Sequence, residues 1–280
     1  MKITVLGASG FIGRHLCAAL TKRGDVVTTA SLRDLPAAVA ACSQADVVVN
    51  LSGEPVAQRW SARAKEMIRA SRVDAPRALI DALGANGSRP NAYVSASAIG
   101  YYGTSETASF DESSAPGSDF LASVCVAWEA EADRASALGM RVAKIRTGLV
   151  LGESGALAKI VPIFKLGGGG VIANGRQWYS WIHIDDQVGI YLHAIDGVDG
   201  VLDATAPQPV RNADFTAALA RALRRPAFFP APAFAIGALL GKASVVVTQG
   251  QRVLPTRTLA TGYRFAYETI DRALDAIVRA

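Results

Sequence analysis

The first sixteen residues, MKITVLGASGFIGRHL, constrain the fold of this chain more than any other stretch. Residues 3–6 form a short apolar run with a β-branched bias, which is typical of a buried strand. Three glycines follow at a GxxGxxG spacing: Gly7 permits a tight turn, Gly10 lets the backbone approach a pyrophosphate, and Gly13 lets the helix pack closely. Phosphates bind the free N–H groups at a helix N-terminus. We therefore predict a dinucleotide site, rather than an ordinary glycine turn, formed by Gly7, Ser9, Gly10, Phe11, Ile12 and Gly13.

The end of the second predicted strand, residues 26–31, bears on which dinucleotide binds. An acidic side chain about twenty residues beyond the glycines would bind the ribose hydroxyls of NAD and repel a 2′-phosphate. This chain instead has Ser31 and Arg33 there, and a guanidinium can bind a phosphate through two parallel hydrogen bonds. The pattern predicts NADP. NAD stays possible, because Asp34 follows directly and Arg33 can also be an ordinary solvated side chain.

Apolar strand patterns alternate with helical patterns over the first 152 residues. The predicted strands are 3–6, 26–31, 45–51, 92–97 and 141–145, and the predicted helices are 12–22, 35–42, 62–83 and 119–137. Pro76 is expected to kink or interrupt the third helix. The alternation predicts an α/β protein with a Rossmann-type, doubly wound parallel sheet, in which the loops after the strands meet at one edge.

Those loops supply the remaining predicted cofactor contacts. These are Leu51, Ser52, Gly53 and Glu54 after the third strand, Ser95 and Ala96 in the fourth, and Gly148 after the fifth. Glu54 is also a candidate base or substrate ligand, although a carboxylate there can simply favour the N-terminus of the next helix.

The pattern loosens beyond Gly152. We expect a strand over 177–184, a further helix capped by the Asp185–Asp186 pair, a strand over 201–204, and helices over 213–223, 234–240 and 270–278. The predicted domains are a Rossmann domain, residues 1–152 with 177–205 returning to it, and a smaller C-terminal substrate lobe, residues 153–176 and 206–280.

Composition excludes several functional classes for this 280-residue chain. Half of the residues are hydrophobic and 19% are charged, which is ordinary for a globular protein. The net charge of +5 comes from scattered basic residues without a basic run or a nucleic-acid-binding motif, so no nucleic-acid partner is expected. The positive balance fits an anionic small molecule equally well.

Cysteine usage and hydropathy predict a cytoplasmic protein. Cys17, Cys42 and Cys125 are far apart and in no metal-binding spacing, so we interpret them as reduced thiols and expect no metal. The apolar stretch 228–240 is too short and too interrupted by prolines to cross a membrane, and the N-terminus is a core strand rather than a signal peptide.

Several motifs spread over nearly the whole chain carry a family resemblance. They are GASGFIG, NLSGEP, SASAIGYYG, DFLASVCVAWEAEA, RTGLVLG, GRQWYSWIHIDD, DATAPQPV and SVVVTQGQRVLP. Together they resemble the extended short-chain dehydrogenase/reductase superfamily, and more closely an atypical branch of predicted epimerases or oxidoreductases with a C-terminal domain of unknown function. The resemblance implies an NAD(P)-binding Rossmann domain and a small substrate lobe. Relatives are often dimers, so a homodimer is a possible assembly.

The superfamily normally carries a Ser, Tyr and Lys triad, in which Tyr is the acid/base and Lys supports it. Ser97 matches the Ser. The Tyr-x-x-x-Lys pair should follow on the next helix, where Leu121 takes the Tyr place and Cys125 the Lys place. Arg72 takes the place of a usual Asn. These departures put the usual proton transfer in doubt.

The catalytic candidates are therefore Ser97, Cys125, Tyr101 and Arg72. Cys125 and Arg72 are also candidate cofactor contacts. A carbonyl group that accepts a hydride needs a proton donor. Serine is too weak an acid for this role, arginine is a poor proton donor, and leucine has no proton to donate. Cys125 can instead be a buried apolar residue, and Arg72 a surface residue.

Tyr101 and Tyr102 can supply the missing phenol or merely pack in the loop that follows Ser97. His183 and Asp185 are read as a structural histidine and a capping aspartate rather than a catalytic pair. Arg146, Arg176 and Trp178 are candidate walls for an anionic or sugar-like substrate.

Two functional hypotheses remain. The first is a cytoplasmic NADP-binding oxidoreductase or epimerase-like enzyme that acts on a small polar substrate. The alternative is a non-catalytic NADP-binding sensor that regulates a partner. The sequence predicts neither the substrate nor the direction of the reaction.

Overall fold

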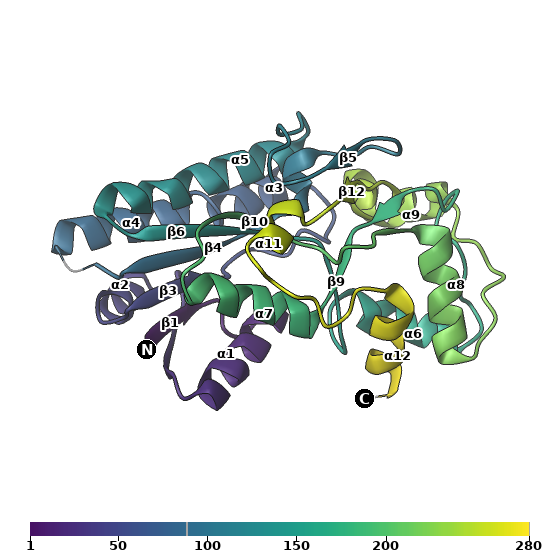
Figure 1. Ribbon diagram of the computed structural model, residues 1–280. Helices are drawn as coiled ribbons and strands as arrows, with labels where there is room; N and C mark the ends of the chain where they lie inside the picture. Colours follow the sequence, from purple (N-terminus) through teal and green to yellow (C-terminus); the bar gives the residue numbers. More distant parts are fainter. Residues whose placement is uncertain (88, 280) are drawn as a thin grey trace.

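The computed structural model describes residues 1–87 and 89–279. Within that part of the chain, the central feature is a six-stranded, fully parallel sheet (Figure 1). Its strands lie in the order β10-β6-β4-β3-β1-β2. They are β1 (Lys2–Leu6), β2 (Val26–Ala30), β3 (Val47–Asn50), β4 (Ala92–Ala98), β6 (Arg141–Thr147) and β10 (Gly200–Ala204). The predicted Rossmann-type fold is confirmed.

Helices cover both faces of the sheet because its strands are apolar on both sides. On one face, α1 (Phe11–Arg23) and α7 (Ile184–Ile195) pack on alternate strand residues such as Ile3 and Val5. On the other, α2 (Leu35–Ser43), α4 (Asp74–Asn86) and α5 (Phe120–Asp133) pack on Leu6, Val48 and Tyr93. Figure 1 shows α4 and α5 above the sheet and α1 and α7 below it.

The winding of the chain reverses between β1 and β3. The chain first places β2 on one side of β1 and then returns to place β3 on the other side. Ligands of open parallel sheets bind in the crevice beyond the carboxyl ends of the strands at such a switch point. The glycine turn after β1 and the loop after β3 follow the two strands at this switch point.

The single helix predicted over 62–83 is two helices in the structure. α3 (Ala62–Ala70) ends at a turn over Ser71–Val73, and α4 then begins at Asp74. Pro76 lies in the first turn of α4, where its missing N–H leaves no hydrogen bond unmade. The predicted interruption is therefore confirmed, but the helix breaks before Pro76 rather than at it.

The strand predicted over 177–184 changes partner in its middle. β8 (Trp178–Tyr179) pairs with β11 (Val210–Arg211), whereas β9 (Trp181–His183) pairs with β7 (Leu149–Leu151). Trp181 belongs to a third apolar core, which lies among the helices of the C-terminal lobe. Ile182 belongs to the core of the main sheet. This segment therefore joins the two parts, and the predicted domain boundaries stay a prediction.

The remaining elements are short segments of the Rossmann part together with the elements of the C-terminal lobe. They are β5 (Ser109–Phe110), α6 (Ala156–Lys165), α8 (Asn212–Leu223), α9 (Ala233–Leu240), α10 (Val245–Thr248), β12 (Arg252–Val253), α11 (Thr256–Ala260), α12 (Ile270–Arg279) and the 3₁₀ helices η1 (Ile99–Tyr102), η2 (Arg134–Leu138) and η3 (Gly241–Ser244). The sequence did not predict α6, whose pattern is obscured by Pro162 and the glycines that follow it. No helix among the described residues is long and apolar enough to span a membrane.

Candidate functional site

In the turn after β1, two of the predicted glycines pack directly against backbone atoms. Gly7 has φ +78°, and a Cβ placed on it would lie 2.8 Å from the carbonyl carbon of Leu51. A Cβ on Gly13 would lie 2.5 Å from the Gly7 carbonyl oxygen, so α1 can approach the turn only without a side chain there. The Gly10 N–H donates to that same Gly7 oxygen at 3.1 Å. Gly7 and Gly13 thus have the conformational and packing roles predicted for them, and contact of Gly10 with a phosphate stays a prediction.

The end of β2 presents a cation rather than an acid. The Arg33 guanidinium is 92% exposed and lies 3.8 Å from the Glu54 carboxylate. Asp34, which the sequence left as an objection to NADP, is occupied as the N-cap of α2: its Oδ1 accepts from the Ala37 N–H at 3.2 Å. Ser31 Oγ accepts from the Arg33 N–H at 3.3 Å. The charged group that reaches toward solvent at the end of β2 is therefore the guanidinium, with the Glu54 carboxylate as its neighbour.

The loop after β3 is held in place by Arg72. The Nη1 group of Arg72 donates to the carbonyl oxygens of Glu54 (2.9 Å) and Ile68 (3.3 Å). Its guanidinium covers Gly53, where a Cβ would lie 2.9 Å from Nη2, and it stacks on Trp128 at 5.1 Å. Burial lowers the pKa of Arg72. Arg72 is therefore a half-buried anchor of this loop rather than a surface arginine.

Asn50 is a site-building residue that the sequence did not single out. It is fully buried at the end of β3, where its Nδ2 donates to the Tyr93 hydroxyl (2.9 Å) and its Oδ1 accepts from the Ser52 N–H (3.0 Å). The asparagine thus sets the course of the chain as it leaves the strand. Its position at a strand terminus was the available signal, because a polar residue ending a buried apolar run needs partners.

Ser97 is not free to meet a ligand. Its hydroxyl donates to Glu129 Oε1 at 2.7 Å, and both side chains are buried. Arg146 pairs with the same carboxylate through two bonds, Nε to Oε1 at 2.7 Å and Nη2 to Oε2 at 2.8 Å. The matching of Ser97 to the superfamily serine predicted its place at the end of β4, but not this sequestration.

The register of the sheet explains this buried network. Ser97, Arg146 and Asp203 lie in one row across β4, β6 and β10, so their side chains share the face covered by α5. The Tyr102 hydroxyl bridges two of them, accepting from Arg146 Nη1 at 2.9 Å and donating to Asp203 Oδ2 at 2.8 Å. Burial, together with the charge of Glu112, raises the pKa of Asp203 well above its usual range.

One predicted substrate wall is wrong. Arg146 is only 3% exposed, and it lies within β6, which runs two residues further than predicted, to Thr147. Its guanidinium binds Glu129 of α5 inside the protein, where α5 covers β4 and β6. Arg176 and Trp178, the other two candidates, lie at the surface, where Arg176 pairs with Glu106 at 3.2 Å and the guanidinium of Arg211 stacks on Trp178 at 3.7 Å.

Cys125 is a buried thiol on α5. A Cβ on Gly100 would lie 3.9 Å from its Sγ and 3.4 Å from the Cβ of Leu121, so both residues pack against η1. Burial, reinforced by the Glu129 carboxylate, raises the pKa of Cys125 to about 12. The thiol therefore stays protonated at neutral pH, which argues for the apolar interpretation over an acid/base role.

The thiols should differ in reactivity accordingly. In the native protein at neutral pH, we expect iodoacetamide to modify the half-buried Cys17 first, and to reach Cys125 and the buried Cys42 only after unfolding in urea. Mass spectrometry of the modified peptides gives the order. Rapid modification of Cys125 in the folded protein would restore it as a candidate acid/base.

His183 is structural, but it takes a role that was assigned to an aspartate. Its Nδ1 accepts from the Asp185 N–H at 3.1 Å, so the histidine itself caps α7. Its ring stacks on Tyr267 at 3.8 Å, and burial lowers its pKa. Asp186 instead accepts from the N–H groups of Ala266 and Tyr267 and ties the C-terminal segment to α7. The predicted aspartate cap is therefore wrong.

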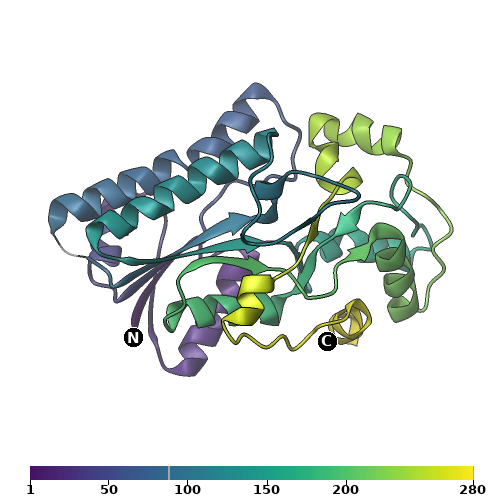
Figure 2. The same ribbon diagram turned by 45° about the horizontal axis from the view of Figure 1, so that its top comes forward.

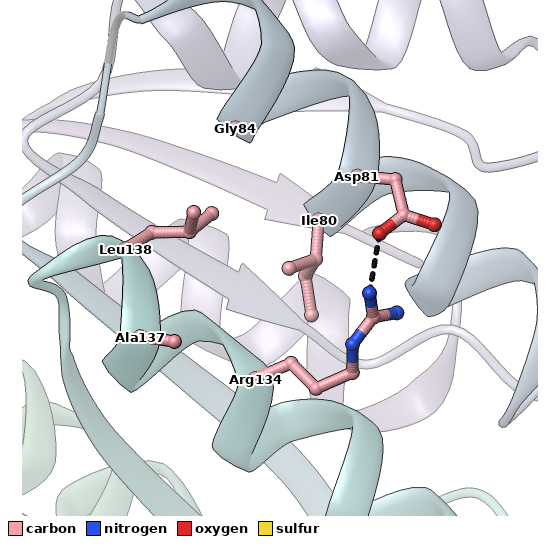
Figure 3. Close-up of a pocket in the computed structure, with 6 residues that line it drawn as sticks. All are labelled: Ile80, Asp81, Gly84, Arg134, Ala137 and Leu138. Atoms are coloured by element: carbon pink, nitrogen blue, oxygen red, sulfur yellow. Dashed lines mark hydrogen bonds and ion pairs between the residues drawn. The ribbon is translucent and has the colours of Figure 1, made fainter.

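One further feature lies away from the switch point. Figure 3 shows a shallow pocket between α4 and η2, lined by Ile80, Asp81, Gly84, Arg134, Ala137 and Leu138. Arg134 Nη2 donates to Asp81 Oδ1 there at 2.6 Å. The pocket lies beside the segment that leads into β6, at the amino ends of the strands.

Within residues 1–87 and 89–279, no group of three or more His, Cys, Asp or Glu side chains is arranged to hold a metal.

Comparison with known proteins agrees with this geometry. Residues 3–204 match the model of the NAD dependent epimerase/dehydratase family, and residues 231–277 match a domain of unknown function, DUF1731. The chain is 40% identical to the chloroplastic SDR39U1 homolog of Arabidopsis thaliana, covering 100% of this chain and 87% of that protein. It is 34% identical to the epimerase family protein YfhF of Bacillus subtilis, covering 99% of this chain and 98% of that protein.

Solved structures give the same result. The crystal structure of human SDR39U1 (isoform 2) with NADPH superposes with a TM-score of 0.92 at 34% identity, covering 100% of this chain and 99% of that one. A UDP-glucose 4-epimerase from Thermotoga maritima superposes at 0.84 with 17% identity, covering 100% and 98%, and shows the shared fold alone. The resemblance to the atypical branch is confirmed, and the prediction of a nicotinamide dinucleotide agrees with these matches. The chain belongs to the NAD dependent epimerase/dehydratase family.

Proposed function

We propose that this protein is an NADP(H)-dependent oxidoreductase or epimerase-like enzyme that acts on a small polar substrate. The observation that carries the choice of NADP is the exposed Arg33 guanidinium at the end of β2, with Asp34 turned into the α2 cap. The human relative was crystallised with NADPH, which supports the same choice.

The residues present fit such a cofactor. Side chains are excluded from Gly7 and Gly13, where a Cβ would collide with backbone, and the loops that hold the other predicted contacts follow the strands at the carboxyl edge of the sheet, where ligands of such folds bind. The first turn of α1 offers N–H groups for the pyrophosphate, Gly10 lets the backbone approach it closely, and Arg33 with Ser31 offers donors for the 2′-phosphate. When bound, the cofactor supplies or accepts a hydride at a substrate carbon.

The remaining predicted contacts are proposals of the same kind. They are Ser9, Phe11, Ile12, Leu51, Ser52, Gly53, Glu54, Arg72, Ser95, Ala96, Cys125 and Gly148. Arg72 acts through the loop it anchors, since its guanidinium covers Gly53 and binds the Glu54 carbonyl. For the substrate, Arg176 and Trp178 favour an anionic or sugar-like molecule.

Arg33→Ala should change which dinucleotide the protein prefers. We expect NADPH to bind about tenfold more weakly and NADH to bind unchanged, because a charge-assisted hydrogen bond to a phosphate contributes roughly 1.5–3 kcal/mol and exposure reduces it. Fluorescence titration of each cofactor measures the two dissociation constants.

A matched control is Arg89→Ala, in which an exposed arginine that donates to the Leu138 carbonyl, far from the crevice, is removed. It should leave both dissociation constants unchanged. Equal affinity of the unaltered protein for NADPH and NADH, insensitive to the loss of Arg33, would contradict the choice of NADP.

A non-catalytic NADP-binding sensor remains the second candidate, because a specific observation favours it. The three positions of the superfamily triad hold a serine bonded to Glu129, a leucine, and a buried thiol. Mixing the protein with NADPH and panels of carbonyl compounds and nucleotide sugars separates the two candidates, with nicotinamide absorbance and product stereochemistry as readouts. Tight NADPH binding without turnover of any substrate would favour the sensor.

Location and assembly stay predictions. We expect a cytoplasmic protein that binds neither nucleic acid nor membrane, and a homodimer is the assembly to test. The Arabidopsis relative is named as chloroplastic, so the compartment has to be determined for each member.

A further inference from the structure

Helix α9 of the C-terminal lobe is apolar on every side, yet it has no buried residue. Its sequence is AFAIGALL, and none of these side chains is enclosed by the described part of the chain. A helix that is hydrophobic all round is normally buried inside a protein. Figures 1 and 2 both show α9 (light green) at the edge of the molecule. Its exposed side is therefore a candidate interface.

Four exposed residues form this side of the helix: Phe234, Ala235, Ala238 and Leu239, termed here the α9 face. At 3.6 residues per turn they lie together on one side of α9. Phe234 is 80% exposed and Leu239 is 73% exposed. The two alanines lie between these large side chains, so the face has hollows as well as projections. Such relief suits the ridges of another helix better than a fluid lipid surface.

Four cations lie beside the C-terminal end of α9. Lys242 follows the helix and is exposed. A Cβ on Gly241, the residue that ends α9, would lie 3.6 Å from the Nε atom of Arg59. Arg63 and Lys65 continue the positive charge along α3, the helix that begins just after Arg59. The cations Arg59, Arg63, Lys65 and Lys242 are termed the basic cluster.

Little negative charge balances the basic cluster. Among the described residues, none of its four members forms an ion pair with a carboxylate. Glu66 is the one acid of α3, and no acid occurs in the chain between Asp214 and Glu268. The surroundings of the α9 face therefore attract an anionic partner. A second copy of this chain, docked through the same surface, would bring cations against cations.

We propose that the α9 face and the basic cluster form a docking surface for an amphipathic helix of a partner protein, with one apolar side and one acidic side. The apolar side packs on Phe234 and Leu239, and acidic side chains along its edge pair with Arg59 and Lys242. This docking surface goes beyond the proposed function, because it does not depend on turnover of any substrate.

A set of fluorescein-labelled helical peptides tests the surface. Each peptide is built from leucine, alanine and either glutamate or lysine, with the leucines either gathered on one side of the helix or scattered around it. Fluorescence anisotropy with the unaltered protein measures each dissociation constant. The glutamate peptide with a leucine side should bind at least about tenfold more tightly than any other. Its affinity should fall as the salt concentration rises.

Two variants separate the apolar contribution from the electrostatic one. Phe234→Gln/Leu239→Gln should weaken binding of the glutamate peptide by about tenfold or more, because it removes the large apolar side chains. Arg59→Glu/Lys242→Glu should weaken binding of the same peptide and strengthen binding of the lysine peptide with a leucine side, because the attraction changes sign.

Matched controls alter exposed residues elsewhere. Val26→Gln changes an apolar residue of β2 that is 63% exposed, and Lys22→Glu reverses a charge in the last turn of α1. Both should leave every dissociation constant unchanged. Circular dichroism confirms that each variant is folded.

The proposal is overturned if the glutamate and lysine peptides bind equally well, or if the loss of Phe234 and Leu239 has no effect. It is also overturned if the protein alone sediments as a dimer that Phe234→Gln/Leu239→Gln dissociates. Binding to phosphatidylglycerol vesicles without binding to any peptide would assign the surface to a membrane instead. Failure of the proposed function is distinct from these outcomes, since it is the absence of NADPH binding to the unaltered protein.

Discussion

Gly13→Ala is expected to reduce NADPH affinity by more than about 100-fold, which is close to 3 kcal/mol of binding free energy. The new Cβ would lie 2.5 Å from the Gly7 carbonyl oxygen and 2.7 Å from the Ala8 Cα. Both are backbone atoms, so no side chain can rotate aside, and α1 has to move away from the turn. The N–H groups that bind the phosphates move with it. Fluorescence titration with NADPH measures the loss.

Gly237→Ala is the matched control. Gly237 is also a helical glycine, in α9, and a Cβ there meets no heavy atom of the described residues within 4 Å. Alanine should leave the affinity unchanged and stabilise the helix by roughly 0.5–1 kcal/mol. NADPH binding to Gly13→Ala with the affinity of the unaltered protein would show that the turn after β1 is not the phosphate site.

The features that sequence predicted well are local ones. The glycine spacing after β1 and the apolar runs of the strands need only short stretches of chain, and each is found where it was expected. The exposed Arg33 also followed from counting along the chain. Asp34 shows the limit of that approach: it stood as an objection to NADP, but its carboxylate accepts a hydrogen bond from the Ala37 N–H, three residues further along the chain.

The features that sequence missed depend on partners far along the chain. Ser97 was placed at the end of its strand, but the carboxylate that binds its hydroxyl comes from Glu129 on α5, and Arg146 reaches the same carboxylate from β6. Only the register of β4 and β6 brings these side chains into one row. Arg146 was therefore mistaken for a substrate contact. Sequence gives the periodicity of a strand but not the partner opposite each residue.

Two arginines from other elements bring positive charge to α5. Arg72 comes from the turn between α3 and α4 and packs on Trp128, and Arg146 comes from β6 and packs on Tyr101. The charge of the Glu129 carboxylate is thus balanced from β6 rather than from a lysine on α5 itself.

Arg146→Met should produce the largest loss of stability of the substitutions considered. It leaves the Glu129 carboxylate buried with the Ser97 hydroxyl as its remaining side-chain donor, and breaking a buried pair costs about 3–5 kcal/mol of unfolding free energy. Urea unfolding monitored by circular dichroism measures the change. At neutral pH we expect a midpoint well below that of the parent protein.

The double variant Glu129→Gln/Arg146→Met should recover most of this loss, because a well-packed neutral pair removes the unpaired charge and replacement of buried ion pairs is often close to neutral. Arg77→Met is the surface control: Arg77 binds Glu131 from a half-exposed position, so water can replace it and the loss should be much smaller. If Arg146→Met and the double variant unfold at the same urea concentration, the stability does not reside in the pairing of Glu129 with Arg146. The row formed by Ser97, Arg146 and Asp203 would then stabilise the sheet through packing alone.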